Sequence, residues 1–291
     1  MTAYEQWDIV SSVGRTALGV AAARALESRD GGLVDDPHAE RLVRAAQPDG
    51  EFAAAIDGTA DDRDAQQLWP ALSAHIGTRS RFFDEFFERA AAAGVRQAVL
   101  LASGLDTRPY RLDWPAGSRV FELDQPQVID FKQDALSGVE PRCEHRAIRA
   151  DLREDWSSAL LGAGFDAAAP TAWLAEGLLS YLPPEAERDL LDHVTRLSAL
   201  GSRLATERAD YSRTSPDDPF FDSLARRFGV ALDQLVYRGD LSRTLEGLTD
   251  RGWQVEQDPD GSALAEQYGR DISGPGEQFV GRVQFAVADL G

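Results

Sequence analysis

The sequence has little or nothing of several features that define large classes of proteins. The single cysteine, Cys143, excludes an intrachain disulfide and a thiolate zinc cluster. The four histidines are scattered, and none forms the helical pair of a zinc protease, so only a metal site of carboxylates stays open. No apolar run approaches the ~18 residues that span a bilayer, and an acidic start differs from a signal peptide. We therefore expect a cytoplasmic protein without a membrane segment.

Basic residues are also in short supply. The 30 Lys and Arg face 49 Asp and Glu, which gives a net charge of −19. Phosphate backbones and anionic membranes repel such a chain, so we expect neither nucleic acid nor membrane as a partner. Lys132 is the only lysine, a bias that indicates the codon usage of a GC-rich genome. The 291 residues, 43% hydrophobic and 27% charged, fit one large globular domain or two small ones.

The first third of the chain has the patterns of helices. An alanine-rich stretch at 13–27 places small apolar residues on one face, and Asp36 before Pro37 is typical of a helix start. A longer helix is predicted at 72–93, after a small, acidic and partly looped stretch at 47–64. Its four phenylalanines indicate a face turned to the core: Phe82, Phe83, Phe86 and Phe87. We predict an N-terminal helical cap over residues 1–94.

After Gly94 the pattern changes to short apolar runs separated by helical segments. Five runs are typical of buried strands: Gln97–Ala102, Arg119–Leu123, His145–Ala150, Thr171–Ala175 and Ser202–Thr206. Two later runs, 253–257 and 279–288, are expected to add strands, and 211–239 is a polar, aromatic-bearing insertion. Strands alternating with helices predict an α/β fold with a doubly wound, mainly parallel sheet over residues 95–291. We expect the cap and this core to pack as one unit.

Acidic residues follow most of these runs. Gly104, Asp124, Asp151, Glu176 and Glu207 come in turn after the five strands. Asp and Glu favour turns and helix starts, which explains any one of them alone. The carboxyl ends of parallel strands lie at one edge of a sheet, where ligands of open α/β sheets bind. Four acids at that edge indicate a binding site.

The first two strand ends favour an adenosyl cofactor. Gly104 allows close approach to the backbone, and Asp124 lies at the spacing of an acid that binds ribose hydroxyls, with a charge that disfavours NADP. G-x-G-x-x-G is absent, because the loop reads GLDTR from Gly104 to Arg108. Asp106 would repel a pyrophosphate, whereas a cation ~4 Å away gains on the order of 4 kcal/mol at an effective dielectric of 20. S-adenosylmethionine, with a sulfonium and no phosphate, suits this edge.

These segments together resemble a known family. LLASGLDTRPYRL (100–112), VFELDQPQVIDFK (120–132), ADL (150–152) and WLAEGLLSYLP (173–183) are similar to the leucine carboxyl methyltransferase family, in its actinobacterial branch of S-adenosylmethionine-dependent methyltransferases. The N-terminal 11–28, Asp36-Pro37 and RSRFFDEFF (79–87) match that branch too. The resemblance covers nearly the whole chain. It implies a class I, Rossmann-like methyltransferase fold with seven strands, the last antiparallel, and N-terminal helices over the cofactor.

The resemblance also implies roles for individual residues. Those carried over as cofactor-binding are Arg79 for the carboxylate, Gly104 in the first loop, Asp124 for the ribose, Asp151 and Leu152 for the adenine, and Glu176 near the methionyl portion. Each of four residues also has a purely structural alternative. Arg79 could be a solvated helix arginine, Gly104 an ordinary turn glycine, Asp124 a helix cap, and Glu176 a glutamate buried against an arginine. Ser80 and Ser103 depart from residues that are common in the family, without weakening the assignment.

For several other residues near these motifs, two roles remain possible. Tyr181, five residues after Glu176, is placed to face the substrate or to belong to the core. Asp106 and Arg108 either contact the ligand or form an internal ion pair. His193 receives no role, and no residue is identified as a catalytic base.

The predicted activity is methyl transfer from S-adenosylmethionine to an oxygen of a small-molecule or peptide acid. A carboxylate acceptor is already ionised and needs no base, whereas an alcohol needs one. The insertion at 211–239 is expected to determine which acceptor binds. The alternatives are an S-adenosylmethionine-binding protein without transferase activity and a nicotinamide-dependent oxidoreductase, which the absent glycine motif disfavours. A hydrolase with a nucleophile elbow is disfavoured because Ser103 lacks the first glycine of G-x-S-x-G.

Overall fold

The fold is built around one mixed seven-stranded sheet. The computed structural model describes residues 12–29, 31–47, 50–60, 63–210, 219–228, 237, 241–272 and 277–291. The strands are β1 (Gln97–Leu101), β2 (Arg119–Asp124), β3 (Glu144–Arg149), β4 (Thr171–Ala175), β5 (Arg203–Ala209), β6 (Trp253–Asp260) and β7 (Val283–Leu290). Their order is β3-β2-β1-β4-β5-β7-β6, with β1 to β5 parallel and β7 antiparallel to both neighbours. This order confirms the predicted fold class, including the antiparallel last strand.

Three strands differ from the sequence prediction by three residues or more at one end, among them β6, which was expected to end at Gln257 and continues to Asp260. β5 was expected to end before Glu207, but it continues to Ala209 because β7 pairs with it along its whole length. Glu207 therefore lies within β5, opposite Phe285, and past the end of the shorter neighbour β4. The run 279–288 was expected to be one strand, but α13 (Glu277–Val280) comes first and β7 begins only at Val283.

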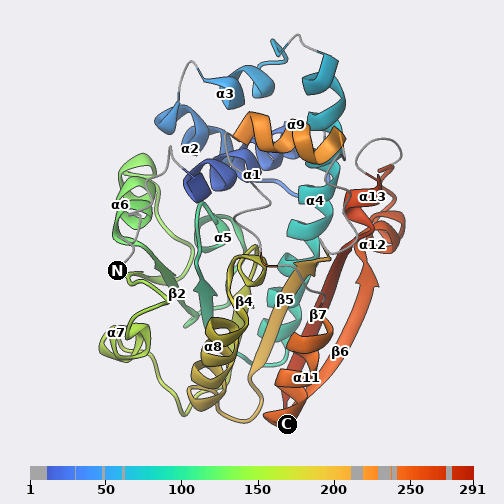
Figure 1. Cartoon of the computed structure of the whole chain (residues 1–291). Helices are drawn as coiled ribbons and strands as arrows, with labels where there is room; N and C mark the ends of the chain where they lie inside the picture. Colours follow the sequence, from blue (N-terminus) through green and yellow to red (C-terminus); the bar gives the residue numbers. More distant parts are fainter. Residues whose placement is uncertain are drawn as a thin grey trace, which may run out of the picture.

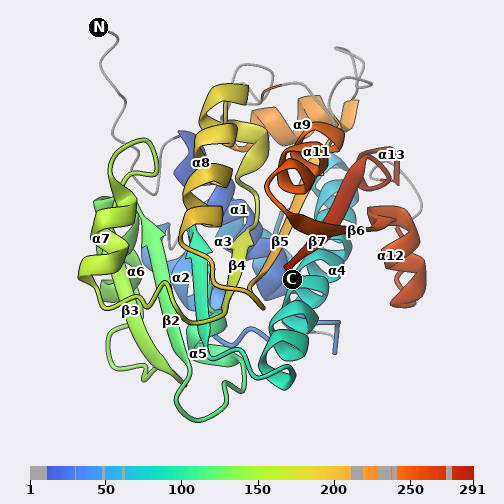
Figure 2. The ribbon, with the colours of Figure 1, turned by 90° about the horizontal axis from the view of Figure 1, so that it is seen from below.

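Helices cover both faces of the sheet. Among the helices that follow β1 in the sequence and connect the strands are α5 (Arg108–Arg111), α6 (Pro126–Ala135), α7 (Trp156–Gly162), the 3-10 turn η1 (Leu179–Tyr181), α8 (Pro184–Arg196), α11 (Ser242–Asp250) and α12 (Gly261–Gln267). On one face, Trp156 of α7, Leu191 of α8 and Leu248 of α11 pack against Trp173 of β4 and its neighbours. Figure 2 shows α8 and α11 on this side and α4 (Arg63–Ala92) on the other.

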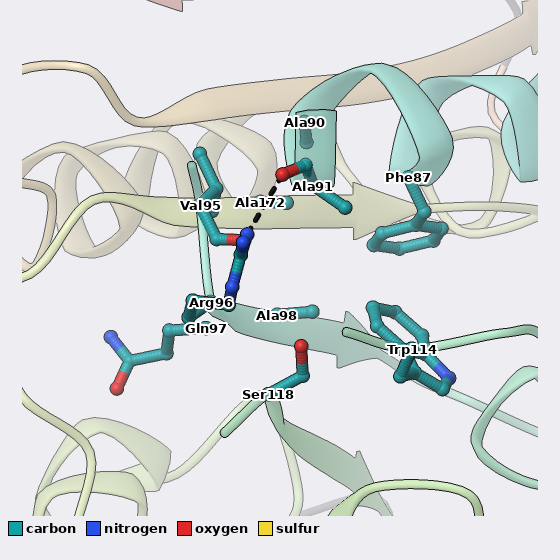
Figure 3. Close-up of a pocket in the computed structure, with 10 residues that line it drawn as sticks. All are labelled: Phe87, Ala90, Ala91, Val95, Arg96, Gln97, Ala98, Trp114, Ser118 and Ala172. Carbon is teal, nitrogen blue, oxygen red and sulfur yellow. Dashed lines mark hydrogen bonds between the residues drawn. The ribbon is translucent and has the colours of Figure 1, made fainter. Parts of the chain in front are cut away.

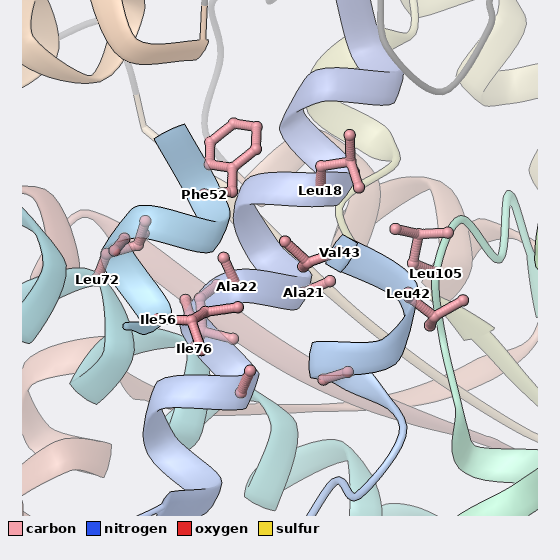
Figure 4. Packing of buried hydrophobic residues seen from close by; sticks show 14 of the residues in the cluster. Leu18, Ala21, Ala22, Leu42, Val43, Phe52, Ile56, Leu72, Ile76 and Leu105 are labelled. Atoms are coloured by element: carbon pink, nitrogen blue, oxygen red, sulfur yellow. The ribbon is translucent and has the colours of Figure 1, made fainter. Parts of the chain in front are cut away.

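The N-terminal helices gather at the carboxyl end of the parallel strands. α1 (Ser12–Arg29), α2 (Ala39–Ala46), α3 (Glu51–Ile56) and α9 (Pro219–Phe228) lie together there in Figure 1. Small residues on α1 allow this packing: a Cβ on Gly19 would lie 2.1 Å from the ring of Phe228 on α9. Leu105, from the loop after β1, belongs to the same apolar cluster as Leu18 of α1 (Figure 4). The cap is thus packed directly on the first loop of the candidate site.

The long helix α4 belongs to the cap and to the sheet at once. Its first half contributes Leu68 and Leu72 to the cap cluster, and its second half lays the four predicted phenylalanines on the sheet, each at most 2% exposed. The expected core-facing stripe is confirmed. The division of the chain at residue 94 stays a prediction. Most of the insertion 211–239 lies outside the described residues, apart from α9 and Tyr237. Within the described part, no helix is both long and apolar enough to cross a bilayer.

Candidate active site

The loop that follows β1 is the centre of the candidate site. Ala102 and Gly104 both have φ of +50°, a left-handed backbone that is uncommon for a residue with a Cβ. The loop closes on β2: the amide of Ser103 donates to the carbonyl of Leu123 at 3.0 Å, and the amide of Gly104 donates to Oδ2 of Asp124 at 2.6 Å. The predicted pair of loop glycine and strand-end acid is therefore in direct contact.

Asp124 is held in place from both sides. Its Oδ1 accepts from the amide of Gln125 at 2.7 Å, so each carboxylate oxygen has one backbone donor. Burial raises the pKa of this carboxyl, and the two backbone hydrogen bonds work against that rise. Each oxygen retains a lone pair for a further donor. The arrangement can accept hydrogen bonds from a pair of hydroxyl groups.

A buried lysine supports the same loop from below. Nζ of Lys132 on α6 lies 2.6 Å from Oε1 of Glu122 on β2, and it donates to the carbonyl of Asp106 at 3.1 Å and to Oγ of Ser103 at 3.3 Å. His145 of β3 lies 2.6 Å from the other oxygen of Glu122. Lys132 and Glu122 are 1% and 0% exposed. The sequence interpretation of Lys132 as a mere trace of codon usage misses this contact.

The cap holds the loop from above through Asp36. This carboxylate accepts from Nε of Arg24 at 2.9 Å and from Oγ1 of Thr107 at 2.7 Å, while Arg24 also donates to the carbonyl of Leu105. Asp36 caps the start of α2 through the amides of residues 38 and 39. That helix begins at Ala39, two residues later than predicted. Asp36 therefore joins the cap to the first loop.

The predicted adenine-binding residues lie at the next strand along the sheet. β3 is adjacent to β2, and the amide of Ala150 donates to the carbonyl of Asp124 at 2.9 Å. Asp151 follows, with its carboxylate held by the guanidinium and the amide of Arg153. Leu152 packs against the apolar cluster that contains Leu101 and Leu123. These two residues are thus beside the Gly104–Asp124 pair, and their contact with adenine stays a prediction.

Arginine and acid side chains form a buried network at the ends of β1 and β4. Nε of Arg79 on α4 lies 2.9 Å from Oε1 of Glu176, and Nη1 of Arg108 lies 2.7 Å from its Oε2. Arg108 also pairs with Asp106 and, at 2.7 Å, with Asp84 of α4. The structure brings Arg79 and Glu176 together as predicted, and it shows both structural alternatives: Glu176 is buried against arginines, and Asp106 forms the internal ion pair. Burial works to raise the pKa of Asp106, but Arg108 lowers it to about 2.

Glu207 was noted in the sequence as a strand-end acid but received no role. It is 6% exposed, and its Oε1 accepts from the amide of Gly177 at 2.7 Å and lies 3.5 Å from Nη1 of Arg79. Gly177 has φ of +64°, which turns that amide toward the strand and favours glycine. Burial raises the pKa of Glu207 to about 7, against the effect of Arg79. Tyr181 shares this environment, and its hydroxyl hydrogen-bonds Thr16 of α1.

A small cavity at the other end of the sheet is not part of this site. It lies near the start of β1, lined by Gln97, Ser118 and the rings of Phe87 and Trp114 (Figure 3). Its free space of about 10 Å³ suits roughly one water molecule. Nor do the described residues contain a cluster of three or more side chains that could ligate a metal ion.

Comparison with known proteins identifies relatives over almost the whole chain. The leucine carboxyl methyltransferase family matches residues 17–195. A protein of Saccharopolyspora erythraea is 52% identical over 282 residues, which is 96% of each chain, and one of Mycolicibacterium smegmatis is 49% identical over 90% of each. Both are named for S-adenosyl-L-methionine-dependent methyl transfer, which agrees with the expected cofactor and the expected actinobacterial branch.

Solved structures agree on the fold. A DUF574 family protein of Streptomyces avermitilis, 16% identical, covers 93% of this chain and 97% of its own with a TM-score of 0.57. A protein of Thermobifida fusca that is described as a methyltransferase gives the same TM-score at 17% identity, with 92% and 94% covered. At this identity the likeness concerns the fold alone, and it confirms the expected class I methyltransferase architecture. By the extent of the sequence match, the chain belongs to the leucine carboxyl methyltransferase family.

Proposed function

We propose that the protein is an S-adenosylmethionine-dependent methyltransferase that methylates a carboxylate oxygen of a small molecule or peptide. The observation that carries the proposal is the Gly104–Asp124 contact of 2.6 Å at the ends of β1 and β2, together with the largely covered Arg79–Glu176 pair, in which Glu176 follows the neighbouring strand β4. An acid suited to a diol and a pair suited to an amino-acid end correspond to the two halves of the cofactor.

The residues of the edge fit this cofactor chemically. Asp124 keeps lone pairs for the two ribose hydroxyls, and Arg79 provides a guanidinium for the cofactor carboxylate. A Cβ on Gly104 would lie 3.7 Å from Ala17 of the cap, in the space where a ligand approaches the loop. Acids outnumber arginines among the paired side chains, which favours a cationic ligand over a phosphate.

Each group then has a role in positioning. Asp124 orients the ribose, Asp151 and Leu152 hold the adenine, and Arg79 with Glu176 fixes the amino-acid end. The bound cofactor supplies a methyl group activated by a positively charged sulfur. The contribution of the protein is alignment of that group with the acceptor, which alone is worth several kcal/mol. Tyr181, next to Arg79 and Glu207, is the proposed acceptor contact.

The engagement of nearby side chains in ion pairs favours a carboxylate acceptor over an alcohol. Lys132 is engaged by Glu122 beneath the loop, and Glu176 and Asp106 are held in ion pairs, so none of these three is ready to remove a proton from an alcohol. Glu207, whose Oε2 has no partner among the described residues, is the exception. A carboxylate needs no such step. We keep the cytoplasm as the proposed location, and the insertion at 211–239 as the proposed determinant of the acceptor.

The proposal is tested by calorimetric titration with S-adenosylmethionine, S-adenosylhomocysteine and NAD, followed by methyl-transfer assays on a panel of carboxylic acids. Micromolar binding of both adenosyl ligands, lost in Asp124→Ala, is expected, with no binding of NAD. Asp130→Ala, which removes a surface acid of α6, is the matched control. A folded protein that binds NAD instead would replace this proposal with the oxidoreductase. Adenosyl binding without transfer to any acid would favour the alternative of a binding protein.

A further inference from the structure

The order of the strands arranges the site residues in a row. Along the carboxyl edge of the sheet, the residues lie in the spatial order Asp151 after β3, Asp124 on β2, Gly104 after β1, Glu176 after β4 and Glu207 on β5. Neighbouring strands are about 4.8 Å apart, so the row extends roughly 19 Å from β3 to β5. With adenine at β3, ribose at β2 and the amino-acid end between β1 and β4, the last position lies beyond the cofactor. Glu207 is therefore at the end of the row, past the residues that are proposed to hold the cofactor, with its Oε1 3.5 Å from Nη1 of Arg79.

Glu207 also differs from the other acids in its hydrogen bonds. Oε2 of Glu176 accepts from Arg108 at 2.7 Å and its Oε1 forms an ion pair with Arg79 at 2.9 Å, and Asp106 is held by the amide and guanidinium of Arg108. Oε1 of Glu207 is bonded to Gly177, but Oε2 is buried and has no partner among the described residues. A buried carboxylate oxygen without a donor is costly, so this atom is positioned for a ligand.

The charges around Glu207 leave one negative charge in excess. The network contains three guanidinium groups and four carboxyl groups: Arg79, Arg108, Arg111, Asp84, Asp106, Glu176 and Glu207. Arg79 and Arg108 favour the ionised form of Glu207, whereas burial and Glu176 oppose it, and the pKa of Glu207 rises to about 7. The charge of Glu207 therefore depends on whether a cation is bound beside it.

We propose that Glu207 serves as the counter-charge of the sulfonium and takes up about half a proton at pH 7 when that charge is lost in the transfer. This inference rests on the proposed function. Transfer breaks the bond between sulfur and the methyl carbon, leaves the electron pair on sulfur, and forms a bond between that carbon and an acceptor oxygen. The sulfonium charge is then lost while the guanidinium of Arg79 stays, and the proton that Glu207 takes up comes from solvent when the acceptor is a carboxylate.

The test needs no acceptor, because it compares the two forms of the cofactor. S-adenosylmethionine and S-adenosylhomocysteine are titrated at pH 7 in phosphate and in Tris, whose different heats of ionisation report the protons released on binding. With a pKa of about 7, Glu207 is half protonated at this pH, so S-adenosylmethionine should displace about half a proton and the neutral thioether almost none.

Glu207→Gln should remove the difference in proton release and lower the preference for S-adenosylmethionine by on the order of tenfold or more. Glu187→Gln changes a similarly buried glutamate, whose partner Arg208 follows Glu207 on β5 and therefore points to the opposite face of the sheet. This variant should leave the proton release and the preference unchanged. Equal proton release by the two ligands in the unaltered protein would overturn the inference, even if the variant fails to fold. Absence of binding by either ligand would refute the proposed function instead.

Discussion

Replacing Lys132 by methionine should uncouple the first loop from the sheet beneath it. The side chain keeps its length but loses its charge, so Glu122, which is fully buried, retains only His145 as a partner for its carboxylate. Removal of one partner of a buried ion pair costs about 3–5 kcal/mol. At roughly 2 °C per kcal/mol for a chain of this size, the melting temperature should fall by about 6–10 °C.

The same substitution should weaken cofactor binding for a separate reason. Lys132 donates to the carbonyl of Asp106 and to Oγ of Ser103, and each hydrogen bond of this charged kind contributes about 1.5–3 kcal/mol. Loss of both lets the loop leave the conformation in which Gly104 meets Asp124. We expect the affinity for S-adenosylhomocysteine to decrease at least tenfold.

The double variant Lys132→Met with Glu122→Gln separates the two effects. It removes both charges, so most of the lost stability should return. The loop contacts are missing in both variants, so the affinity should stay low. Urea denaturation measures the first quantity and calorimetry the second. This account of the loop would be refuted if the unfolding free energy of Lys132→Met lay within about 1 kcal/mol of that of the original protein. It would also be refuted if the double variant regained the affinity for S-adenosylhomocysteine.

Three other predictions follow from single side chains. The pKa of Glu207 rises from 4.5 to about 7 on folding, so its favourable contribution, full below pH 4.5, is lost as the pH rises to 7. At 1.36 kcal/mol per pH unit this amounts to about 3 kcal/mol of unfolding free energy. Urea denaturation at pH 5 and pH 8 should show this decrease in the original protein but not in Glu207→Gln. Asp124→Asn should reduce S-adenosylhomocysteine affinity by roughly 10–100-fold, because an amide nitrogen cannot accept from the amide of Gly104, whereas Asp130→Asn should not. Burial raises the pKa of Cys143 to about 12, so Ellman's reagent should modify it slowly in the folded protein and rapidly in urea.

The inner strands were predictable because parallel strands covered on both faces are continuous apolar runs. β3 was also expected to be a buried strand, but it lies at the edge of the sheet, and of its residues only Ile148 is buried. β1 and β4 are buried at every position, and each boundary was predicted to within one residue. The end of β5 was missed because it depends on β7, which is almost 80 residues further along the chain. The short α3 was missed for a different reason: its core residues, such as Phe52, lie in a small and acidic segment that lacks a strong pattern.

The candidate site was predictable where a residue type and its spacing carry the chemistry, as with Gly104 and Asp124. The supporting charges were harder to find, although the sequence contains a signal for them. Glu122 interrupts the apolar, buried middle of β2, and Lys132 follows Val128 and Ile129 on the apolar face of α6. A charged residue at a core position requires a partner of opposite charge, so these two could have been matched. No such signal exists for Glu207, whose free oxygen depends on the packing of α4 and the β4 loop around it.

The first loop explains why this edge of the sheet favours a cofactor without phosphate. A glycine-rich loop binds pyrophosphate with backbone amides that have no partner within the protein. Here the amides of Ser103, Gly104, Asp106 and Arg108 are already bonded, to Leu123, Asp124, Ser103 and the Asp106 side chain. Two of these four acceptors are carboxylates, which would also repel a phosphate. Apart from Gly104, the loop is held by side chains and backbone carbonyls rather than by further glycines, and the two carboxylates among its acceptors make the edge better suited to a cation than to a phosphate.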